Sequence, residues 1–210
     1  LTLQFIGEYR PHTELPNLLE LHGIQLKDFD LSGLAAVHPH LKELRLWGAP
    51  GNLQNFSAVR EFRELTHLST FDLFGFGADD IPTPEQMPEL RWFWMTSLPE
   101  TAAKAAKQLW KGKAGMDLRI TKPRKPEWLA QNLDNPFRGW DGAEHIPAAA
   151  AKKAANQYRK TRSQLMKLAA EPGEDAKTQA LETVAAYTQT FNKMGFIETE
   201  ERDEIYMALR

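Results

Sequence analysis

Large aromatic side chains recur among charged residues in the first 120 residues of this 210-residue chain. The aromatic candidates are Trp47, Phe74, Trp92 and Trp94, and the polar candidates are Glu20, His22, Arg45, Asp72 and Arg119. Tryptophan and arginine contribute much of the binding energy at protein interfaces, because they bury large areas and still make polar contacts. Side chains of these types, gathered on one surface, predict a site that binds a protein partner.

The sequence has none of the common catalytic or metal-binding motifs. It contains no cysteine, which excludes disulfides, cysteine-ligated metals and thiol catalysis. It also lacks a G-x-S-x-G elbow, a Walker A loop, an H-E-x-x-H helix and an EF-hand loop. The pair His38 and His40 has no third ligand nearby, and a helix N-terminus explains the acidic run at 198–204. We therefore expect no metal, no cofactor and no catalysis. An enzyme that uses Glu20, His22, Arg45 and Asp72 is an alternative.

The composition is that of an ordinary globular protein, with 42% hydrophobic and 26% charged residues. No apolar run approaches the length of about 18 residues that a membrane-spanning helix needs. The expectation is a cytoplasmic protein without a membrane partner.

Charge is distributed unevenly along the chain. Residues 1–100 carry seven lysine or arginine residues against 14 acidic ones, whereas residues 101–126 carry eight against one. The basic segment is interpreted as a solvated helix surface. The alternative is a nucleic-acid-binding or metabolic regulator that uses this segment, whose candidates are Lys104, Lys107, Lys111, Lys113, Arg119, Lys122, Arg124 and Lys125.

A short strand-like motif, apolar–any–apolar, recurs through residues 1–121. Its copies begin at Leu3, Leu19, Leu44, Phe71, Phe93 and Leu118, and the last four steps are 22 to 27 residues long. Three copies have a further leucine three residues earlier: Leu41, Leu68 and Leu90. The segment resembles a leucine-rich-repeat (LRR) solenoid of a divergent bacterial type. The family's ladder asparagine is absent, because Ile24, Ala49, Phe76 and Leu98 occupy its column. The alternative is a mixed α/β sheet with evenly spaced strands.

The segments between the motifs predict short helices or turns on one side of a parallel sheet, which is an α/β class. The resemblance implies that a protein partner binds on the concave face. Because strand side chains alternate, the residues between the apolar ones would form that face. These residues include Trp47, Phe74, Trp92 and Trp94, with Glu20, His22, Arg45, Asp72 and Arg119 around them. The alternative is that another segment folds back and buries the aromatic residues.

The remainder of the chain predicts two further parts. Residues 122–147 are rich in proline and glycine and predict a linker, or a cap in which residues 135–140 cover the end of the solenoid. Residues 148–210 predict a module of three amphipathic helices, the last with Thr199 as its N-cap. Its expected buried residues are Tyr158, Leu165, Val184, Phe191, Ile205 and Leu209.

These patterns together favour non-catalytic protein–protein recognition. A small binding protein with an acidic N-terminal half suits a basic partner, so a bacterial immunity protein that neutralises a toxin is the specific hypothesis.

Overall fold

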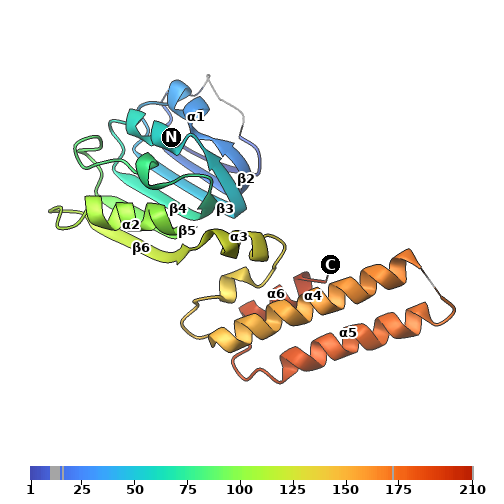
Figure 1. Cartoon of the computed structure of the whole chain (residues 1–210). Coiled ribbons are helices and arrows are strands. Elements are labelled where there is room, and N and C mark those ends of the chain that lie inside the picture. Colours follow the sequence, from blue (N-terminus) through green and yellow to red (C-terminus); the bar gives the residue numbers. More distant parts are fainter. Residues whose placement is uncertain (10–14, 16, 172, 210) are drawn as a thin grey trace. The chain divides into compact units, whose positions relative to one another are not determined.

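The computed structural model describes residues 1–9, 15, 17–171 and 173–209. The chain divides into two compact units, Leu1–Leu129 and Ala130–Arg210 (Figure 1). The first unit contains a six-stranded parallel sheet with helices, so the predicted α/β class is confirmed. Within the described part of the chain, none of the helices has the length and apolar run needed to cross a bilayer.

The strands of the first unit lie side by side in their order along the chain (Figure 1). They are β1 (Thr2–Ile6), β2 (Glu20–Asp30), β3 (Glu43–Gln54), β4 (His67–Phe74), β5 (Trp92–Pro99) and β6 (Asp117–Arg124). The described helical segments between them are α1 (Leu31–Val37), η1 (Phe56–Glu61), η2 (Ala78–Asp80) and α2 (Glu100–Leu109). Each strand therefore pairs with the next one in the sequence after a single return connection.

One column of apolar residues runs across all six strands on the covered face of the sheet. Its members are Leu3, Leu21, Leu44, Leu68, Phe93 and Leu118, which are paired strand by strand. Four members of this column, in β2 to β5, have another buried leucine three residues earlier in the sequence: Leu18, Leu41, Leu65 and Leu90. These columns pack in one core with side chains of α1, η1 and α2. Burial of these leucines stabilises the sheet by about 1.5–3 kcal/mol per side chain.

The register differs from the predicted one in two strands. In β2 the core column is at Leu21 rather than Leu19, a shift of two residues that keeps the same faces. In β4 it is at Leu68 rather than Phe71, and a shift of three residues exchanges the faces. Phe71 therefore points to the surface, whereas Asp72 is 3% exposed.

A left-handed backbone residue at a repeated position explains the error in β4. It stands four residues after the core residue in β2, β4, β5 and β6, at Gln25, Asp72, Ser97 and Lys122. Each such residue interrupts the alternation of side chains, as in a β-bulge. The next residue then turns into the core in three strands, at Leu26, Leu73 and Leu98. The segment 71–73 therefore imitates an alternating strand motif that starts in the wrong place.

The second unit is helical. It contains η3 (Arg138–Trp140), α4 (Ala148–Ala170), α5 (Ala176–Asn192) and α6 (Thr199–Met207). Its core is formed mainly by the buried side chains of Phe137, Trp140, Tyr187, Phe191 and Met194.

Several expectations for residues 122–209 need correction. A helix, α3 (Pro126–Asn132), lies in the segment expected to be a linker or loop, and its first residue is a proline, which suits that position. Phe137 and Trp140, expected in a linker or cap, are buried in the core of the helical unit. The N-cap of α6 is Glu198 rather than Thr199. Val184, expected to be buried, is 39% exposed.

Candidate functional site

The face of the sheet opposite its leucine core, called the open face, presents three rows of side chains. The first row is Thr2, Glu20, Glu43, His67, Trp92 and Asp117. The second row is Gln4, His22, Arg45, Ser69, Trp94 and Arg119. The third row contains Trp47, Phe71, Thr96 and Thr121. Parallel pairing holds these side chains about 4.8 Å apart from strand to strand.

Four aromatic side chains of β3, β4 and β5 are exposed on this face. Trp47, Phe71, Trp92 and Trp94, called the aromatic group, are 36% to 43% exposed. Three of them are sequence candidates, and Phe71 stands where Phe74 was expected. Phe74 is 6% exposed, and its ring stacks with Trp128 at a centroid distance of 6.0 Å.

Ion pairs surround the aromatic group on both sides. The Glu43 carboxylate accepts a hydrogen bond from His22 Nε2 at 3.0 Å and forms an ion pair with Arg45 Nε at 2.6 Å. On β6, Arg119 binds both carboxylate oxygens of Asp117 at 3.1 Å. The guanidinium carbon of Arg119 also lies 4.4 Å from the centroid of the Trp94 ring. These contacts hold the charged side chains in place around the aromatic group.

A hollow of about 250 Å³ opens among these side chains. Its lining comprises Arg45, Trp47, His67, Leu68, Ser69, Trp92 and Trp94. The hollow exists because Ser69 is small and its neighbours on all sides are large. The imidazole of His67 forms one wall, where Thr66 Oγ1 lies 2.8 Å from His67 Nδ1. The site can therefore receive one flat or bulky group from outside.

The structure does not bring the four enzyme candidates together. Asp72 lies on the buried side of β4, and Glu20 accepts a hydrogen bond from Thr2 Oγ1. His22 and Arg45 share the Glu43 carboxylate.

Three of the eight basic candidates have separate surroundings in the structure. Lys104 pairs with Glu100 on α2 at 3.1 Å, whereas Arg119 belongs to the open face. Arg124 is buried, with its guanidinium carbon 4.1 Å from the Trp128 ring centroid and its Nε donating to Ser97 Oγ.

The acidic run at 198–204 caps and anchors α6. The imidazole of His145, 2.8 Å from Glu201 Oε1, and the backbone N–H of Glu198 lower the pKa of the buried Glu201 carboxyl. Burial raises the pKa of Glu204, although a hydrogen bond from Trp140 Nε1 opposes this shift. Among the described residues no group of three histidine or acidic side chains is placed to hold a metal ion.

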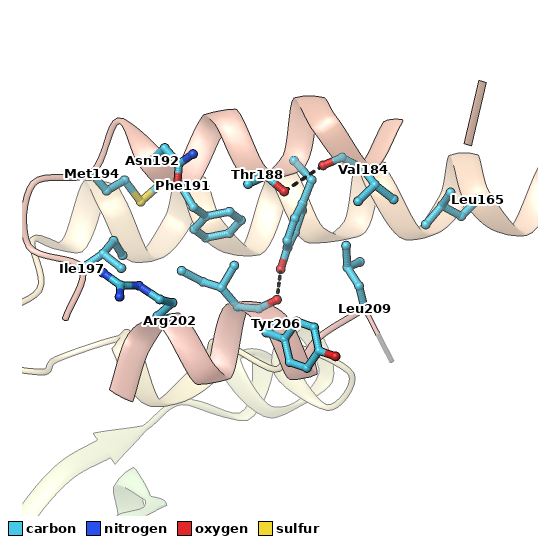
Figure 2. Close-up of a pocket in the computed structure, with 12 residues that line it drawn as sticks. Leu165, Val184, Thr188, Phe191, Asn192, Met194, Ile197, Arg202, Tyr206 and Leu209 are labelled. Atoms are coloured by element: carbon cyan, nitrogen blue, oxygen red, sulfur yellow. Dashed lines mark hydrogen bonds between the residues drawn. The ribbon is translucent and has the colours of Figure 1, made fainter. Parts of the chain in front are cut away.

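The helical unit has an apolar groove of about 600 Å³ between α5 and α6 (Figure 2). Figure 2 shows Val184, Thr188 and Phe191 on one side and Arg202 and Tyr206 on the other. At its floor, the Tyr187 hydroxyl donates to the Ile205 carbonyl at 3.0 Å, and burial raises the pKa of Tyr187. Sequence periodicity placed Leu165 and Val184 in a closed core, but both line this groove.

Comparison of the chain with protein-family models, curated proteins and solved structures gave no match.

Three residues of the open face, His67, Ser69 and Phe71, were not candidates in the sequence. One signal would have found them. The buried leucines Leu18, Leu41, Leu65 and Leu90 recur at steps of 23, 24 and 25 residues. Counting from this column gives the correct register of β4.

Proposed function

We propose that this protein is a non-catalytic recognition protein that binds a protein partner on the open face of its sheet. The observation that carries the proposal is the exposed aromatic group, fixed on regular strands and flanked by ion pairs. Exposed aromatic clusters with a polar surround are typical of interaction sites. Because the strands are rigid, little side-chain ordering is needed on binding, which favours affinity.

We further propose that the first unit is an LRR-like solenoid. Three features support this interpretation: strands paired in sequence order, leucine columns on the covered face, and core residues that recur after 23 to 25 residues from β2 onward. The ladder column holds Leu26, Leu73 and Leu98 in place of asparagine. The proposed solenoid therefore closes its turns with apolar contacts rather than with an asparagine network.

The specific form of the proposal is a bacterial immunity protein that neutralises a basic toxin in the cytoplasm. The excess of acidic residues in the first 100 positions supports it, because opposite charge speeds association. Glu20 adds negative charge to the open face.

The test uses a photo-crosslinking amino acid at Phe71 on the open face and, as a control, at the exposed Leu181 on α5. The protein captured at Phe71 is then purified and titrated against Trp94→Ala and Leu181→Ala. We expect Trp94→Ala to weaken binding about 30-fold, which is the effect of losing roughly 2 kcal/mol. Leu181→Ala should stay within about twofold. The proposal would be overturned if the two substitutions weakened partner binding equally, or if neither weakened it.

Nucleic-acid binding is tested in parallel by retention on immobilised DNA at rising salt. Steep, salt-sensitive retention that disappears when Lys107 and Lys111 are changed to glutamate would favour the regulator alternative.

A further inference from the structure

We propose that the hollow above Ser69 binds one aromatic side chain of the partner, held between the Trp94 ring and the Arg45 guanidinium. The inference deepens the proposed function and rests on it, because it names the group that the open face recognises. It comes from a comparison of two neighbouring rows on the same strands.

In the first row the place on β4 is filled from within the chain. His67 stacks on Trp92 of β5 with a centroid distance of 3.9 Å and planes 7° apart. In the second row the place on β4 belongs to Ser69, beside Trp94 of β5. A stacked ring therefore exists in one row, and its counterpart is missing in the next.

The two faces of the Trp94 ring have different surroundings. Arg119 of β6 covers one face, with its guanidinium carbon 4.4 Å from the ring centroid. The opposite side faces β4, where Ser69 leaves the hollow open. On the far side of that hollow, Arg45 of β3 continues the same row. From β3 to β6, this row therefore contains the Arg45 guanidinium, the hollow above Ser69, the Trp94 ring and the Arg119 guanidinium.

The strand spacing matches the thickness of a single ring. Arg45 and Trp94 are two strands apart, which is about 9.6 Å at the usual strand separation. A flat group in contact on both faces needs about 3.5–4.0 Å on each side, or about 7–8 Å in total. Two stacked rings would need about 11 Å or more.

Charge selects an aromatic ring over other groups. The negative face of a π system complements the guanidinium of Arg45, and an offset stack on Trp94 adds a second favourable contact. A cationic guest would be repelled by Arg45 and Arg119. A carboxylate would compete with Glu43 and Asp117, which already hold these arginines. An aliphatic guest would fill the volume without either π contact.

The first experiment follows the Trp94 indole N–H by NMR in the full-length protein, assigned by its loss in Trp94→Phe. The probes are N-acetyl-tyrosinamide, N-acetyl-leucinamide and adenosine. We expect saturable shifts with the tyrosine amide and at least tenfold weaker binding of the other two. Preference for the leucine amide or for adenosine, or no saturable shift with any probe, would overturn the inference.

The second experiment fills the hollow from within. Ser69→Trp should weaken binding of the tyrosine amide at least tenfold, whereas the matched control Ser69→Ala should stay within about twofold. Thermal unfolding confirms that both variants are folded. If Ser69→Trp does not fold, Ser69→His, which copies the His67 arrangement, replaces it. Unchanged binding in a folded, filled variant would overturn the inference.

The captured partner separates this inference from the proposed function. If the partner binds Ser69→Trp normally but not Trp47→Ala, the open face is the interface and the aromatic guest is wrong. If it binds both variants normally, the proposed function fails as well.

Discussion

The imidazole ring of His67 lies parallel to the indole ring of Trp92, with 3.9 Å between their centroids and 7° between their planes. The two residues are direct neighbours on β4 and β5, so the sheet itself imposes this arrangement. This stacking orders the Trp92 side chain, although it is 39% exposed. Trp92 is therefore a preformed part of the aromatic group, whose exposed residues contribute to the fold differently from their neighbours on the covered face.

Adjacent residues on β5 should therefore respond differently to truncation. Phe93→Ala removes a ring that is fully buried in the leucine column and should cost about 3–5 kcal/mol of unfolding free energy. Trp94→Ala removes an exposed ring and one cation–π contact and should cost about 1 kcal/mol. Denaturant unfolding of both variants measures the difference. A larger loss for Trp94→Ala would mean that Trp94 belongs to the core.

Glycines in the first unit should differ in their tolerance of alanine. A Cβ atom at Gly48 would lie 2.1 Å from the carbonyl oxygen of Asp72, so Gly48→Ala must displace backbone and should cost about 1–3 kcal/mol. Gly33 lies in α1 with open space around it, and Gly33→Ala should stabilise the protein by about 0.5–1 kcal/mol. Melting temperatures should move in opposite directions. A tolerated alanine at Gly48 would contradict the close approach of β3 and β4.

The left-handed residue Gln25 should prefer glycine to valine. Its φ of 57° is strained for any residue with a Cβ atom and worst for a β-branched one. We expect the unfolding free energy of Gln25→Gly to exceed that of Gln25→Val by about 1–2 kcal/mol. Lys27, also exposed on β2 but without a positive φ, is the control, because a strand position of negative φ should prefer valine. The same order at both positions would argue against the repeated bulge.

Two carboxyl groups of α6 should give opposite pH dependences. The folded-state pKa of Glu201 is lowered, first by the hydrogen bond from His145, so its stabilising effect is present above the usual glutamate pKa and lost as the pH falls. Below about pH 4.3, the unfolding free energy should therefore fall less steeply in Glu201→Gln than in the unsubstituted protein.

The pKa of Glu204 is raised by burial, so its ionised form destabilises the fold as the pH rises through that value. Glu204→Gln keeps an acceptor for Trp140 and should make the protein at least as stable at pH 7. Urea unfolding at pH 3.5, 5 and 7 tests both variants. A destabilised Glu204→Gln at pH 7 would show that its charge is favourable.

The sequence by itself determined the α/β class, the parallel strands in their order along the chain and the helices of the second half. These features follow from the spacing of apolar residues within short segments, so they can be predicted without knowing which segments pack together. The open face was predicted through Trp47, Trp92 and Trp94, because β3 and β5 follow simple alternation up to those residues.

The sequence offers two core positions for β4, Leu68 and Phe71, and only the tertiary structure decided between them, and with that the exchange of Phe74 for Phe71 and the burial of Asp72. The left-handed backbone at Asp72 breaks the alternation of side chains. A search of the sequence for residues that alternate every two positions does not detect this break. The hollow above Ser69 likewise depends on side chains from three strands, whose distances apart are set by pairing and not by sequence separation.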